Sequence, residues 1–164
     1  MKKSDTNESI IKNYEGKLPD KYQIYELVDT IRAFFRAYFG DAVKVDSNIT
    51  ESYYILLKGK EFAMFLKESL KLQRGKSTLH IYMENTIDLL NIVIGTKDGL
   101  EISEEERIRL NDLAIEGDFA MEIIQGTIII RHKIYTAESI PLNANKRHIP
   151  LYDDLRKVFF GDII

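Results

Sequence analysis

Few residues of this chain combine a reactive side chain with a spacing that favours chemistry. Glu68 lies within the segment 65–71, and Asp98 and Gly99 follow a segment of alternating apolar residues. A carboxylate such as Glu68 can ligate Mg²⁺, which prefers oxygen ligands. Gly99 and Gly117 can bring backbone N–H groups close to an anion, because glycine has no Cβ. These four residues are the candidates for a ligand site.

The other reactive side chains are better explained without chemistry. His80, His132 and His148 are the three histidines, and we interpret them as surface or boundary residues rather than as phosphate acceptors. Three consecutive glutamates at 104–106 fit the start of a helix, where the macrodipole favours negative charge. No G-x-S-x-G elbow, Walker loop or H-E-x-x-H motif occurs, which disfavours hydrolase and P-loop functions.

Composition narrows the class of protein. The 164 residues predict one domain with a substantial core. The net charge of -3 leaves no basic field for nucleic-acid phosphates, so we expect no nucleic-acid partner. The absence of cysteine excludes disulfides and thiolate chemistry. No apolar run approaches the roughly 20 residues that cross a bilayer, so we expect a cytoplasmic protein without a membrane partner.

Hydrophobic periodicity predicts the elements that position these residues. Apolar residues at three- and four-residue steps from Ile24 to Tyr38 predict a helix that ends at Gly40. A short strand at 43–45 and an extended piece at 53–57 follow, and then a second helix from Lys60 that ends at 74–76. Period-two alternation at 78–83 and 89–94 predicts an antiparallel hairpin.

The second half of the chain adds helices and a last strand. Ser103 and Glu106 have the spacing of a capping box, which predicts a helix start. We expect Gly117 to interrupt this helix, a further helical turn at 119–124, and an end at Gly126. A β-branched run at 127–130 predicts a central strand, and 152–160 a short helix. The fold class is therefore α+β, with helices packed on one face of an antiparallel or mixed sheet.

This order of elements resembles the ATP-binding domain of histidine kinases and their GHKL relatives. The resemblance covers about 22–133, where a helix, two strands, the Asp98-Gly99 turn, a helix and a strand follow one another. We divide the chain into a polar tail at 1–19 and a single α+β domain at 20–164. Within that domain, 134–164 forms an extension beyond the kinase-like core.

The resemblance implies a site for ATP and Mg²⁺, but the matching positions carry different residues. Glu68 stands where the family has the Asn that contacts magnesium. Lys97 stands where an Asp receives the adenine amino group, and an ammonium can only donate hydrogen bonds. Gly117 is the one glycine left for the second Gly-rich turn, and acids flank it. The interval from Gly99 to Gly117 is also short for the family's ATP lid.

Aromatic residues are the remaining feature. Phe34, Phe35, Tyr38 and Phe39 wrap most of one helix turn, so something outside the sheet layer must cover some of them. Phe159 and Phe160 of the last helix are one candidate cover, and a second protein chain is the other. The interface candidates are therefore Phe35, Phe39, Phe159 and Phe160.

These patterns predict a degenerate, non-catalytic member of the kinase-like fold. We expect a protein-interaction or scaffold module in bacterial signalling, with no bound cofactor. Its partner would be another protein, either a regulator or a second copy in a homodimer. One alternative is an active ATP-binding histidine- or serine-kinase-like domain, with Glu68 near Mg²⁺ and Asp98 at the adenine. The other alternative is an unrelated α+β domain.

Overall fold

The computed structural model describes residues 20–50, 53–73, 77–136 and 150–161. Their secondary structure consists of β1 (Asp20–Gln23), α2 (Ile24–Phe39), the 3₁₀ turn η1 (Gly40–Ala42), β2 (Val43–Ser47), β3 (Tyr54–Leu57), α3 (Gly59–Lys71), β4 (Leu79–Asn85), β5 (Leu89–Gly95), α4 (Glu104–Gly117), β6 (Ala120–Ile124), β7 (Thr127–Lys133) and α5 (Pro150–Phe160).

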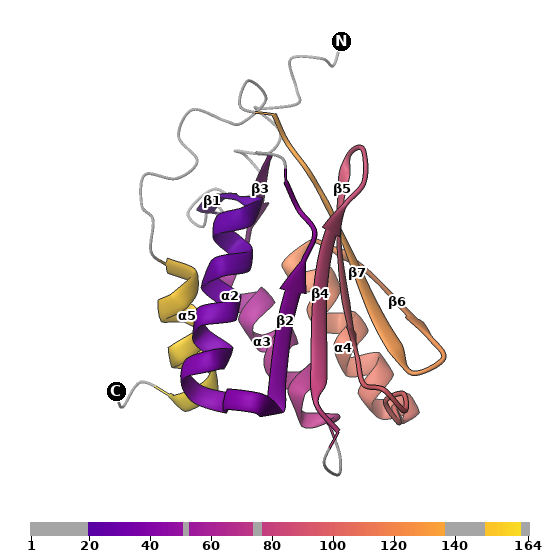
Figure 1. Ribbon diagram of the computed structural model, residues 1–164. Coiled ribbons are helices and arrows are strands. Elements are labelled where there is room, and N and C mark those ends of the chain that lie inside the picture. The colour runs from indigo at the N-terminus through magenta and orange to yellow at the C-terminus, as the bar shows by residue number, and fades with distance from the viewer. Residues whose placement is uncertain (1–19, 51–52, 74–76, 137–149, 162–164) are drawn as a thin grey trace.

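The main sheet has five strands in the order β2-β4-β5-β7-β6 (Figure 1). β2 runs parallel to β4, and every other neighbouring pair is antiparallel, so the sheet is mixed. β1 and β3 form a separate antiparallel pair. The predicted hairpin of β4 and β5 is confirmed, and β7 is an internal strand as predicted.

The helices cover one face of this sheet. Val45, Ile81, Ile94 and Ile128 are paired in register across four strands, and all are buried. Residues one step along each strand point to the opposite face, where Lys44 and His80 are exposed and Val93 and Ile129 are half-buried. The predicted α+β fold with helices on one face of a mixed sheet is therefore confirmed.

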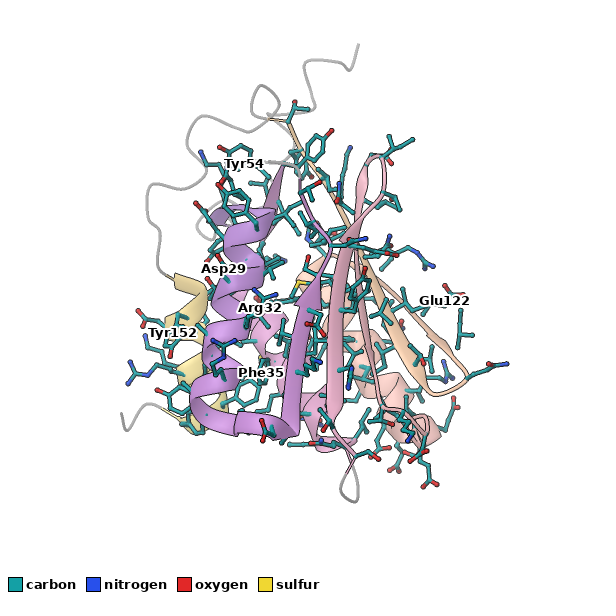
Figure 2. All side chains as sticks on the ribbon, in the orientation of Figure 1. Asp29, Arg32, Phe35, Tyr54, Glu122 and Tyr152 are labelled. Atoms are coloured by element: carbon teal, nitrogen blue, oxygen red, sulfur yellow. The ribbon has the colours of Figure 1, made fainter. Side chains whose placement is uncertain are left out.

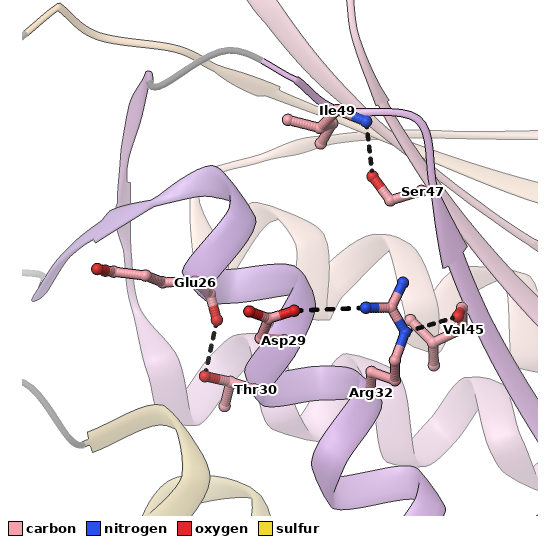
Figure 3. A network of polar contacts seen from close by, with 7 residues as sticks. All are labelled: Glu26, Asp29, Thr30, Arg32, Val45, Ser47 and Ile49. Carbon is pink, nitrogen blue, oxygen red and sulfur yellow. Dashed lines mark hydrogen bonds and ion pairs between the residues drawn. The ribbon is translucent and has the colours of Figure 1, made fainter.

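An arginine of α2 covers part of the edge strand β2. Arg32 donates from Nε to the carbonyl of Val45 (3.1 Å) and pairs with Asp29 (3.3 Å), as Figure 3 shows. Edge strands carry unpaired carbonyls that can template pairing with another chain. Arg32 satisfies one such carbonyl, and it ties α2 to the sheet at the same time.

The C-terminal helix α5 packs beside α2 through aromatic rings (Figure 1). The Phe159 ring lies 5.1 Å from Phe34, 5.8 Å from Phe35 and 5.7 Å from Phe39, between centroids. Figure 2 labels Phe35 on α2 and Tyr152 on α5, the latter 5.8 Å from Phe34 in an edge-to-face contact. Aromatic pairs favour such tilted and edge-to-face geometry.

The aromatic interface candidates thus meet one another within the chain. Phe35 is 1% exposed and its ring lies against Phe159, so within the chain the C-terminal helix, one of the two predicted covers, packs over it. Phe39 and Phe159 are partly buried against the same core. Phe160 remains 39% exposed at the rim of the cluster.

The segment after α4 differs from the prediction. Residues 120–124 form the edge strand β6 and not a further helical turn. Asp118 has a left-handed φ of 64°, which ends the helix, and the strand then pairs with β7 through a turn at Gln125 and Gly126. Alternation of exposed and half-buried residues in β6 is the period-two signal that the sequence reading overlooked.

Some predictions concern residues outside the described ranges. These are the polar tail at 1–19, the helix end at 74–76, His148, and most of the extension between Thr136 and α5. In the described part of the chain, no helix is both long enough and apolar enough to span a membrane.

Candidate functional site

A groove of about 680 Å³ lies between α3, α4 and α5. Its volume is within the range of ligand pockets, about 300–1,000 Å³. Cationic side chains from all three helices line it: Lys60, Lys67, Lys71, Arg109 and Lys157. The two lining carboxylates are Glu68 and Asp154, and the apolar lining comes from Met64, Leu113 and Val158.

Long side chains link α3 and α4, which run antiparallel along the groove. Glu68 on α3 pairs with Arg109 on α4, with 3.1 Å between Oε1 and Nε. At the other end, Lys58 donates from Nζ to the carbonyl of Glu116 (2.9 Å). The start of α4 is fixed by the predicted capping box, in which Ser103 and Glu106 bond to each other's backbone N–H.

The carboxylate of Glu68, the predicted magnesium ligand, is paired with Arg109 and Lys71. Its second oxygen accepts from Lys71 Nζ at 3.2 Å, and its side chain is 17% exposed. Both oxygens of this carboxylate are therefore engaged in ion pairs. As the structure places it, Glu68 links two helices and lines the groove.

Asp98 and Gly99 line a different cavity, of about 440 Å³, at the end of β5. Gly99 has a φ of 86° and donates its N–H to the Thr96 carbonyl (3.2 Å), so it closes a turn as the sequence predicted. Ser77 donates to the Asp98 carboxylate at 3.3 Å. Lys97, in the position of the family's adenine-binding Asp, is exposed.

Gly117 lies far from both of these residues. Gly117 is the last residue of α4, whereas Gly99 lies before the first residue of that helix. The fourteen residues of α4 span about 20 Å. A Cβ at position 117 would lie 2.5 Å from the Phe119 ring and 3.4 Å from Glu61 Cβ. Gly117 therefore permits close packing of α4 and Phe119 against α3.

Phe119 and His132 form the inner wall of the α4 side. The Phe119 ring lies edge-to-face on Phe65 at 5.2 Å and stacks on His132 at 6.4 Å. His132 was interpreted as a surface or boundary residue, but it is buried, at 9% exposure. Burial lowers the pKa of its imidazole, partly opposed by the hydrogen bond to the Lys133 carbonyl (3.3 Å).

The sequence reading missed the cations of the groove. Lys60, Met64, Lys67 and Lys71 recur at three- and four-residue steps, so they share one face of α3, and a helical projection could have found this stripe. Arg109 and Lys157 join it only through tertiary packing. Among the described residues, no group of three or more His, Asp or Glu side chains is arranged to hold a metal ion.

Comparisons with known proteins identify the fold. No family model matches this sequence, and no curated protein matches it. Solved structures do match: one nucleotide-free crystal form of the catalytic domain of histidine kinase ThkA superposes with a TM-score of 0.52 and 11% identity, over 74% of this chain and 98% of that domain. A second crystal form gives 0.51 and 12%, over the same shares of the two chains.

The chain therefore has the fold of histidine kinase catalytic domains. The predicted resemblance is confirmed at the level of the fold, and the alternative of a differently arranged α+β fold is not supported. Identity of 11–12% carries information about the chain path and none about activity.

Proposed function

We propose that this protein is a non-catalytic interaction or scaffold module of bacterial signalling, built on the histidine kinase ATPase fold. The observation that carries the proposal is the separation of the candidate nucleotide residues. Glu68 lines the groove between three helices, Asp98 and Gly99 line another cavity, and Gly117 is at the far end of α4. A nucleotide site needs its metal, phosphate and base contacts in one cavity.

The donor set also fits a magnesium–ATP complex poorly. Glu68 is already paired with Lys71 and Arg109, and a metal would have to displace both. Helix α4 begins at Glu104, so only four residues separate it from Gly99 and no lid-sized loop lies between them. At the adenine position, Lys97 offers a donor where an acceptor is required.

One observation favours the alternative function, an active ATP-binding kinase-like domain. Three of the five cations that line the groove lie on α3, the helix that corresponds to the metal-binding helix of the family, and cations attract polyphosphate. Under this alternative, Glu68 would face the magnesium and Asp98 the adenine. The two functions therefore differ in whether the residues at the adenine position bind the adenine base.

Calorimetric titration with ATP and Mg²⁺ separates the two functions. We expect no saturable binding in the micromolar range, and no hydrolysis of ATP. Micromolar binding that Asp98→Asn abolishes would contradict the proposal. Asp88→Asn is the matched control, because Asp88 is an exposed aspartate in the turn between β4 and β5.

A further inference from the structure

The groove between α3, α4 and α5 has a charge opposite to that of the chain. Five cationic side chains face two carboxylates, an excess of three positive charges, whereas the whole chain carries a net charge of -3. A groove with low-dielectric walls focuses the field of like charges inside it. Its surface therefore selects an anionic occupant, although the protein as a whole repels one.

Both carboxylates of the groove are already engaged within the protein. Glu68 pairs with Lys71 and Arg109. The carboxylate of Asp154 lies directly over Gly59 in the first turn of α3, so close that a Cβ at position 59 would overlap it. A carboxylate at a helix N-terminus is stabilised by the macrodipole. With both acids counted, the side chains that line the groove still carry an excess of positive charge.

The cations differ in how far they are committed. Lys67 donates to the Val158 carbonyl at 3.0 Å and so holds α5 against α3. Lys60 and Lys157 are exposed at the rim, on two different helices. The lining between these charges is apolar, from Met64 and Leu113 among others.

We propose that this groove binds an acidic peptide segment of a partner protein, with an apolar side chain of that segment seated between the lysines. The inference rests on the proposed function and names the chemistry of the partner. Charge complementarity steers such a segment to the groove, and burial of its apolar residue holds it there.

The mixture of charge and apolar surface favours a peptide over a small anion. An inorganic anion would use the cations and leave the half-buried Met64 and Val158 in contact with water. A segment that carries both acidic and apolar side chains covers both kinds of surface. Helix-lined grooves commonly bind peptides through apolar anchors in this way.

Fluorescence anisotropy with the full chain tests the proposal. The probe is a short fluorescein-labelled peptide of glutamates around two central leucines. We expect saturable binding that weakens as NaCl is raised, because salt screens exposed charges. The double variant Lys60→Glu/Lys157→Glu should weaken binding by about tenfold or more, because it reverses two charges at the rim. Both lysines are exposed, so the variant should fold.

Matched controls separate the groove from general electrostatics. Lys44→Glu/Lys97→Glu changes the net charge equally at exposed positions outside the groove and should alter affinity by less than about twofold. A peptide with serines in place of the leucines should bind about tenfold more weakly, which tests the apolar lining. A peptide with lysines in place of the glutamates should not bind.

Three results would overturn the inference. These are no saturable binding of the glutamate–leucine peptide, equal losses in the two double variants, and equal affinity for the leucine and serine peptides. None of these results bears on the proposed function, which fails instead if ATP with Mg²⁺ binds in the calorimetric titration. The two failures are therefore distinguishable.

Discussion

The two sides of the helix layer are packed by different physical means. On the α5 side, Phe159 meets three rings of α2, and Phe34 at the centre of the cluster is fully buried. On the α4 side, Phe119 provides one aromatic wedge beside smaller buried residues such as Leu110, and the exposed edge is linked by charged pairs such as Glu68–Arg109.

This difference indicates which side carries stability and which is available for binding. A dry aromatic cluster gains from both burial and ring geometry, whereas partly exposed ion pairs contribute little. The charged side leaves the groove open, and its cations face solvent. We therefore expect substitutions at the centre of the aromatic cluster to lower stability and substitutions of the exposed groove cations to alter binding.

The largest effect is expected for Phe34→Ala. Phe34 is 0% exposed and contacts rings of both α2 and α5, so its removal should lower the free energy of unfolding by about 3–5 kcal/mol. Urea denaturation followed by circular dichroism measures the change. Phe160→Ala, at the 39% exposed rim of the same cluster, should cost less than about 1 kcal/mol. Equal losses would refute the view that the centre of this cluster carries stability.

A smaller effect is expected at the start of α4. Ser103→Ala removes the side-chain acceptor for the Glu106 N–H (3.1 Å) and should cost about 1 kcal/mol of unfolding free energy. Because α4 forms one wall of the groove, affinity for the acidic peptide should also fall. Ser103→Thr keeps the acceptor and should restore both quantities. A loss of stability that Thr does not rescue would argue against the capping box.

The smallest effect is a pH dependence on the α4 side. The unfolded chain protonates His132 near its ordinary pKa of 6.5, whereas burial lowers the pKa in the folded chain. The unfolded state then binds more protons, so stability declines as pH falls below about 6.5 towards the folded pKa. His132→Phe preserves a ring against Phe119 and should flatten this decline in urea titrations between pH 5 and 7, roughly the window of histidine.

The exposed His80 supplies the control for this measurement. His80→Gln also removes an imidazole, but from the open face of the sheet, and so gives the reference for the loss of a histidine outside the core. A variant at His132 with the same profile as the wild-type chain would show that the buried imidazole does not set it.

Much of the fold could be predicted from local patterns. The helix from Ile24, the hairpin of β4 and β5, and the capping box at Ser103 all follow from periodicity or spacing within a few residues. The strand β6 is not evident from the sequence because it is only five residues long and half-exposed. Its apolar residues fit a helical turn equally well. Tertiary pairing with β7 decided between the two.

The candidate site was less predictable. Position along the chain predicts four residues of a nucleotide site, Glu68, Asp98, Gly99 and Gly117. The structure distributes them over two cavities and a helix end. The basic lining includes Arg109 and Lys157, which are far apart in sequence from the lysines of α3. No pattern among residues close in sequence predicts that these side chains come together.

The sequence by itself determined the order of elements, the alternating strands and the resemblance to the kinase fold, because these depend on neighbours along the chain. Only the tertiary structure decided that α5 covers Phe35, that His132 is buried, and that cations from three helices line one groove. The burial of a side chain and the electrostatic field inside a groove depend on which surfaces pack together. That packing joins residues that are distant in sequence.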